Sequence, residues 1–106
     1  MIKTNNIELP DKLTKNGFYA SDKLEDRIDK KELVHIISFI ELHFYKTKSI
    51  NKKQSSYGLK HLVARDIGIN VSNGDLIASM IMCGYRHKVE GINCYFNAKI
   101  RSAEVG

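Results

Sequence analysis

Two short helical segments joined by a tight turn constrain the fold of this chain most. The first segment, YGLKHLVARDI, carries its apolar residues on one side and stops at Gly68, which suits the left-handed end of a helix. The second segment starts at Ser72, an expected N-cap, has Asp75 at its third position, and runs to Cys83 before Gly84. Two amphipathic helices this close in the sequence are expected to bury their apolar sides in a shared core.

A segment that begins at Asp29 is predicted to form a further helix. Asp29 and Glu32 have the spacing of a capping box, in which an N-cap acceptor and a carboxylate three residues later satisfy free backbone N–H groups. Apolar residues then recur at helical spacing in KKELVHIISFIELHFYK. The residues on this stripe are Leu33, Ile36, Ile37, Ile40 and Phe44. Phe39, Leu42 and Tyr45 lie off the stripe, so the helix either packs on more than one side or presents a surface to a partner.

The segments on either side of this helix show no clear periodicity. We expect residues 1–28 to be an N-terminal arm that is partly irregular, with Ser21 capping a helical turn in SDKLEDRI. Residues 46–56, KTKSINKKQSS, contain four lysines and no acidic residue, and we expect an exposed loop. This loop is either a solvated connection or a segment that contacts phosphates. Ser55 or Ser56 at its end is expected to cap the next helix.

The C-terminal part of the chain alternates between apolar and polar residues, as a half-buried strand does. Residues 92–100 alternate strictly, and residues 85–89 alternate in the same way. The Glu90–Gly91 pair between the two runs allows a tight turn. The pattern therefore predicts an antiparallel β-hairpin.

This order of elements resembles a winged helix-turn-helix domain over about residues 29–101. Ala64 and Gly68 also match the small-residue and turn-glycine spacing of that family, whereas Gly74 stands where its pattern has an apolar residue. The resemblance implies an α+β, mostly helical fold, with a three-helix domain and a C-terminal β-hairpin over residues 29–106. The stretches SYGLKH and SNGDLI are also similar to uncharacterised small proteins of phages and mobile elements. The predicted core is Leu33, Ile36, Ile37, Ile40, Phe44, Leu59, Leu62, Val63, Ile67, Leu76, Ile77, Met80, Ile81 and Phe96.

The positive charge of the chain lies in its C-terminal part. Residues 46–106 hold ten Lys or Arg and four Asp or Glu, whereas residues 1–45 hold seven and eight. Such an excess favours a polyanionic partner, either a nucleic acid or an acidic protein surface. No apolar run suits a signal peptide or a membrane span, so we expect no membrane partner and a cytoplasmic location. Cys83 and Cys94 are then expected to be reduced, with a disulfide between them as the less favoured alternative.

The last predicted helix would enter the major groove if the domain read DNA as the resembled family does. Its predicted outward side chains, at positions 74, 75, 78, 79 and 82, include no cation, so only Asn73 and Ser79 are candidates for contacting bases. Cations elsewhere would hold the phosphate backbone. Tyr57 and Tyr95 are candidates for stacking on unpaired bases. The predicted nucleic-acid-binding set is Lys52, Lys53, Lys60, Arg65, Asn73, Ser79, Arg86, Lys88, Lys99 and Arg101.

No pattern of residues indicates catalysis, a metal site or a cofactor. The histidines and cysteines lack the spacing of metal ligands, and there is no glycine-rich phosphate loop. The first hypothesis is therefore a non-enzymatic, regulatory protein that contacts mainly the phosphate backbone of nucleic acid, DNA ahead of RNA. The alternative is a protein-binding inhibitor or adaptor, encoded by a phage or mobile element and directed at a host defence or nucleic-acid-processing complex. Its contacts would come from Phe39, Leu42, Ala78 and Met82, and a homodimer stays open under both hypotheses.

Overall fold

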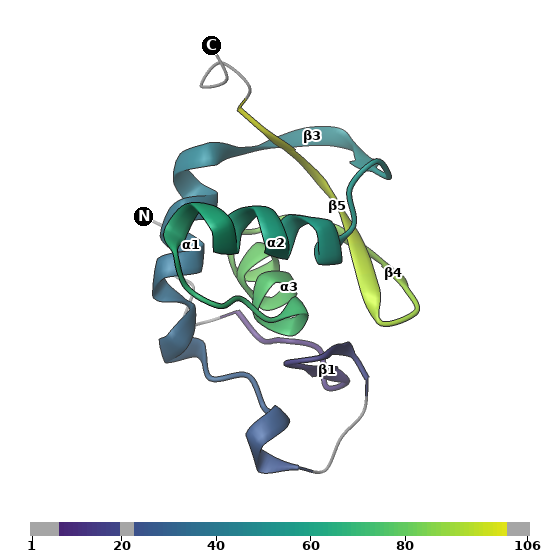
Figure 1. Cartoon of the computed structure of the whole chain (residues 1–106). Coiled ribbons are helices and arrows are strands. Elements are labelled where there is room, and N and C mark those ends of the chain that lie inside the picture. Colours follow the sequence, from purple (N-terminus) through teal and green to yellow (C-terminus); the bar gives the residue numbers. More distant parts are fainter. Residues whose placement is uncertain (1–6, 20–22, 102–106) are drawn as a thin grey trace.

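Three α-helices and two antiparallel sheets make up the described part of the chain, residues 7–19 and 23–101, in a computed structural model (Figure 1). The helices are α1 (Val34–His43), α2 (Ser56–Ile67) and α3 (Asn73–Met82), with short 3-10 segments η2 (Leu24–Asp26) and η3 (Lys30–Leu33) before them. The strands are β1 (Leu13–Thr14), β2 (Gly17–Phe18), β3 (Phe44–Asn51), β4 (His87–Glu90) and β5 (Asn93–Ile100). Within these residues, no helix is both long enough and apolar enough to cross a membrane.

Strand β5 is the central strand of the larger sheet, whose order is β3–β5–β4. β4 pairs with β5 in unbroken antiparallel register, from His87 opposite Phe96 to Glu90 opposite Asn93. Gly91 in the connection has a φ of 63°, a left-handed conformation that glycine adopts without strain. The antiparallel pairing predicted from the two alternating runs is therefore present.

Strand β3 was not predicted. Helix α1 ends at His43, three residues earlier than its apolar pattern indicated, and the segment expected to be a loop begins instead as an edge strand. β3 pairs with β5 at Phe44–Lys46 and again at Asn51, and residues 47–50 between them form a bulge. Phe44 is buried as predicted, but it reaches the core from this strand rather than from α1.

Local capping signals place the ends of the helices. The Ser55 side chain accepts a hydrogen bond from the backbone N–H of Gly58 at the start of α2, and Ser72 does the same for Asp75 at the start of α3. Gly68 ends α2 in the left-handed conformation, as predicted. The predicted capping box at Asp29 is only half formed, because Glu32 pairs with Lys15 instead of reaching back to residue 29. Ser21, the other predicted cap, lies outside the described residues.

The core lies between the three helices and the inner face of the larger sheet. Ten of the predicted core residues are buried, and four others, Ile37, Leu62, Ile67 and Ile81, are partly buried against them. The core also takes in side chains outside that list. These are Leu13, Val71, Ala78, Met82, Cys83, Tyr85, Cys94 and Ala98.

The β1–β2 ladder packs on α3 and continues the core. Leu13 is 7% exposed and belongs to the core cluster, and Phe18 packs against it. The Lys15 carbonyl oxygen accepts a hydrogen bond from the Gly74 backbone N–H at 2.9 Å, and the Phe18 N–H donates to the Ile92 carbonyl oxygen at 3.0 Å. The N-terminal segment therefore joins the start of α3 to the turn between β4 and β5 (Figure 1).

Candidate nucleic-acid interface

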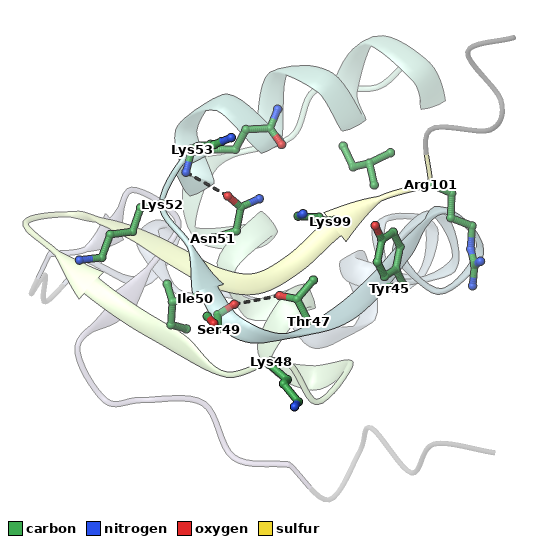
Figure 2. A pocket seen from close by; sticks show the side chains of 12 residues that line it. Tyr45, Thr47, Lys48, Ser49, Ile50, Asn51, Lys52, Lys53, Lys99 and Arg101 are labelled. Carbon is green, nitrogen blue, oxygen red and sulfur yellow. Dashed lines mark hydrogen bonds between the residues drawn. The ribbon is translucent and has the colours of Figure 1, made fainter.

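A groove lined by positive side chains runs along β3 and the end of β5 (Figure 2). Its volume is about 970 Å³, and twelve residues line it. Five of the twelve are cations, namely Lys48, Lys52, Lys53, Lys99 and Arg101, and none of the twelve is acidic. Because neighbouring cations repel one another unless an anion lies among them, this groove is suited to a polyanionic ligand.

The bulge of β3 that carries Lys48 is held by side chains from the rest of the sheet. The amide of Asn97, which is 6% exposed, donates to the Thr47 carbonyl oxygen at 3.0 Å. Its Oδ1 accepts from the Arg86 backbone N–H at 2.7 Å, and the Arg86 guanidinium donates to the Lys48 carbonyl oxygen. These bonds satisfy backbone groups that the bulge removes from the strand ladder, so the backbone under Lys48 is set by the fold.

Two polar side chains on the groove wall, Asn51 and Thr47, are already bonded within the protein. The Asn51 side chain donates to the Ala98 carbonyl oxygen and accepts from the Lys53 backbone N–H, both at 3.1 Å. The Thr47 hydroxyl donates to the Ser49 carbonyl oxygen at 2.8 Å. Direct reading of bases requires free donors and acceptors, so these two side chains are poorly placed to read bases, and the five cations of the groove are its main means of holding a ligand.

Tyr45 is the aromatic residue of the groove, and sequence reasoning missed it. It is 40% exposed and lies directly opposite Lys99 in the β3–β5 register. The Arg101 guanidinium carbon is 6.0 Å from the centre of its ring, and Figure 2 shows the ring between Lys99 and Arg101. The predicted helix through residue 45 hid this neighbourhood, because only the strand pairing brings Tyr45 to Lys99.

The groove brings together four residues of the predicted binding set: Lys52, Lys53, Lys99 and Arg101. The other predicted cations lie elsewhere. Lys88 is exposed on β4, and Arg86 supports the bulge rather than lining the groove.

The two predicted cations of α2 are outside the groove and are partly occupied. The Lys60 ammonium lies 5.4 Å from the centre of the Tyr57 ring and 3.5 Å from the Val71 carbonyl oxygen. Arg65 forms an exposed ion pair with Asp66 at 3.7 Å. Exposed pairs of this kind hold their partners weakly, so neither residue is excluded from a ligand, but neither converges on the groove.

The predicted outward face of α3 is buried, which corrects the assignment of Asn73 and Ser79 as base contacts. Asn73 is 7% exposed and Ser79 is fully buried. The Asn73 amide donates to the Asn93 side chain at 2.8 Å and to the Ile92 carbonyl oxygen at 3.3 Å, and the Ser79 hydroxyl donates to the Asp75 carbonyl oxygen at 2.8 Å. The prediction failed because the helix was treated as facing solvent, whereas the β1–β2 ladder and β5 cover it.

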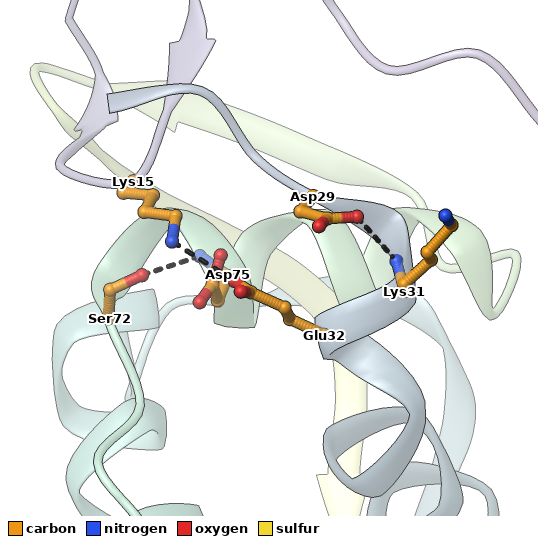
Figure 3. A network of polar contacts seen from close by, with 6 residues as sticks. All are labelled: Lys15, Asp29, Lys31, Glu32, Ser72 and Asp75. Carbon is orange, nitrogen blue, oxygen red and sulfur yellow. Dashed lines mark hydrogen bonds and ion pairs between the residues drawn. The ribbon is translucent and has the colours of Figure 1, made fainter. Parts of the chain in front are cut away.

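A polar junction lies at the start of α3 (Figure 3). Lys15, from the turn between β1 and β2, pairs with Glu32 at 3.1 Å. Burial raises the pKa of Asp75 above its ordinary value, while the nearby Lys15 charge and the Ser72 hydroxyl oppose this rise. Its Oδ1 atom is buried without a hydrogen-bond partner. This junction joins the N-terminal segment to the domain, and the Lys15 charge in it is already paired with Glu32.

Of the four residues predicted to bind a protein partner, two are buried and two lie at the surface. Ala78 and Met82 are buried in the core, so their predicted exposure was wrong. Leu42 is 70% exposed and Phe39 is partly exposed, and both line a shallow apolar depression of about 340 Å³. Its other lining residues are His35, Ser38, Ile67 and Ile69.

The two cysteines lie in the interior of the domain. Cys83 and Cys94 are both free and buried, and burial raises the pKa of each thiol to about 12. A thiol that stays protonated at neutral pH is a poor nucleophile and a poor metal ligand. Within residues 7–19 and 23–101, no three His, Cys, Asp or Glu side chains gather as metal ligands would.

Comparisons with known proteins do not assign this chain to a family. No protein-family model matches the chain, and neither a curated protein nor a solved structure matches it. The functional proposal therefore depends on the charge and geometry of the groove.

Proposed function

We propose that this chain is a non-enzymatic nucleic-acid-binding protein that holds the phosphate backbone in the groove along β3. The observation that carries the proposal is the convergence of five cations, without a carboxylate, on one concave surface. Phosphate contacts from Lys and Arg supply affinity without sequence information. A regulatory protein of this kind acts by occupying nucleic acid rather than by reading a base sequence.

The scaffold that we propose for this function is a variant of the winged helix-turn-helix domain. Three helices followed by the paired strands β4 and β5 support the assignment. The variant differs from the resembled family in the surface that it uses. Because the N-terminal segment covers α3, the nucleic acid is held along β3 and the end of β5 instead.

The test is binding of labelled DNA and RNA by fluorescence anisotropy between about 50 and 200 mM salt. Five phosphate contacts give a log–log salt slope of about −4.5 on duplex DNA and about −3.5 on a single strand. The double variant Lys52→Ala/Lys53→Ala should weaken binding on every sequence and reduce the slope by about 1.8 or about 1.4, respectively.

The matched control removes the same charge from another surface. Lys12 and Lys31 are both exposed and do not line the groove, so Lys12→Ala/Lys31→Ala should leave the slope unchanged. The variant Lys60→Ala/Arg65→Ala distinguishes the groove from α2 and should have the smaller effect. Equal losses in all three double variants would mean that overall charge, and not the groove, governs binding.

A protein-binding function remains the second candidate, and the exposed Leu42 at the apolar depression favours it. Large apolar side chains exposed beside one another are typical of interaction surfaces. A second copy of the chain is the partner that can be tested with the purified protein. Analytical ultracentrifugation should then show a dimer, and the Leu42→Asp variant should be a monomer. A wild-type protein that is monomeric at all concentrations would contradict the homodimer hypothesis.

A further inference from the structure

We infer that the groove takes single-stranded nucleic acid, with Tyr45 stacking on an unpaired base while Lys99 and Arg101 hold the flanking phosphates. This inference rests on the proposed function and names the ligand class of the same site. It depends on three features of the molecule: the exposed ring, the cations on both sides of it, and the burial of α3, the helix that would enter a duplex in the resembled family.

The first feature is the position of the Tyr45 ring within the cationic row. Tyr45 and Lys99 are cross-strand partners, so their side chains lie on the same face of the sheet. Arg101 follows Lys99 by two residues, a spacing of roughly 6.7 Å on an extended chain. The Arg101 guanidinium lies near the ring at 6.0 Å, so the aromatic residue and both charges are adjacent. A base on the ring would therefore have its own phosphates within reach of the two cations.

The second feature is that the position of this row is fixed. The Arg101 backbone N–H donates to the His43 carbonyl oxygen at 2.8 Å, which holds the chain after β5 against the end of α1. Tyr45 is the second residue of β3 and is paired in regular register. A stacking platform that is already in place loses little conformational freedom when a ligand binds.

The third feature distinguishes a single strand from a duplex. Bases in a duplex are stacked inside it, so only its phosphates and groove edges could meet the Tyr45 ring. In the resembled family a helix enters the major groove of the duplex, and the matching helix α3 is buried here. Single strands instead bind to positively charged grooves with aromatic side chains that accept any base.

The chain contains no tryptophan, which permits a direct test of stacking. The variant Tyr45→Trp places a unique tryptophan in the groove. We expect oligo(dT) and oligo(U) to quench its fluorescence on binding, and a duplex of the same length to leave it nearly unchanged. A second variant, Tyr57→Trp, is the control, because Tyr57 is 55% exposed on α2 and outside the groove lining. Quenching of both tryptophans by the same amount would overturn the placement at Tyr45.

Affinity gives an independent measurement. Tyr45→Leu should weaken binding of oligo(dT) about five- to a hundredfold, which is the range for loss of one base–aromatic stack. Tyr45→Phe keeps the ring and should bind as the wild type does, and circular dichroism reports whether each variant is folded. Equal affinity of Tyr45→Leu and wild type, or tighter binding of duplex than of single strand, would overturn the inference and leave the proposed function standing.

The remaining outcomes concern other ligands. Absence of binding to both single strands and duplexes at about 50 mM salt would remove the proposed function itself. If a poly-glutamate peptide binds as tightly as oligo(dT), the groove selects ligands by negative charge alone. That result would also overturn the proposed stacking of a base on Tyr45.

Discussion

The Thr14 carbonyl oxygen occupies the space that a side chain on residue 74 would need. An ideal Cβ built on Gly74 would lie 1.6 Å from that oxygen, and the Gly74 N–H donates to the neighbouring Lys15 carbonyl at 2.9 Å. Glycine at this position thus lets two stretches of backbone meet at the start of α3. Its departure from the apolar residue of the resembled pattern has a structural reason.

Replacement of Gly74 tests this close packing. We expect Gly74→Ala to lower the free energy of unfolding by about 1–3 kcal/mol, the usual cost of overpacking, because rigid backbone must move to admit the methyl group. Urea unfolding measures the loss. Gly58→Ala is the matched control, because Gly58 also lies on a helix and a Cβ added there meets nothing within 4 Å. We expect this variant to raise the free energy of unfolding by about 0.5–1 kcal/mol. A Gly74→Ala variant as stable as wild type would contradict the packing described.

Asn97 should be important for stability because it bonds to backbone on two sides. Asn97→Ala leaves the Thr47 carbonyl and the Arg86 N–H without their partner, and we expect a loss of about 1–3 kcal/mol. Asn70 is exposed, and Asn70→Ala should change stability by less than about 0.5 kcal/mol. Both are measured by urea unfolding. Equal stabilities of the two variants would mean that the bulge does not depend on Asn97.

The stability of the domain should depend on the ionisation of Asp75. Burial raises its pKa above the ordinary value of 3.8, so the folded state binds this proton more tightly than the unfolded state. The resulting stabilisation is present at low pH and is lost as the pH rises through the folded pKa. The stability of Asp75→Asn relative to wild type should therefore increase as the pH rises above the ordinary pKa of 3.8. Urea unfolding at a series of pH values measures the difference, and a difference that shrinks with rising pH would have the wrong sign.

The cysteines should resist modification in the folded protein. Burial and a pKa of about 12 leave almost no thiolate on Cys83 or Cys94 at neutral pH. We expect a thiol reagent such as dithionitrobenzoate to react at least about a hundredfold more slowly with native than with guanidinium-unfolded protein. Rapid reaction of one thiol in the native state would show that local unfolding exposes it readily, which would contradict this prediction.

Short-range signals in the sequence predicted most of the helical part of the fold. The caps Ser55 and Ser72 and the terminator Gly68 act within a few residues of their partners, so their chemistry is readable from the chain itself. The alternation in residues 92–100 likewise identified β5, because one face of it is buried.

The missed features all depend on distant partners. β3 is an edge strand with few buried residues, and it pairs with residues about fifty positions later, so its sequence looks like a loop. The covering at the start of α3 comes in part from two strands of two residues each, too short for any period to appear. These two omissions also account for errors in the site: Tyr45 was overlooked, and Asn73 was placed on the surface.

The bond between Phe18 and Ile92 joins residues that are 74 positions apart in the chain. During synthesis on a ribosome, at about 5–20 residues per second, the N-terminal ladder is made roughly 4–15 s before the strands that it touches. Leu13 and Phe18 are made about sixty residues before α3, which they cover in the folded protein, so for most of that interval their native surface has not yet been synthesised. The N-terminal ladder can therefore complete its native contacts only after Ile92 has been made, and until then its apolar side chains depend on partners that are still to be synthesised.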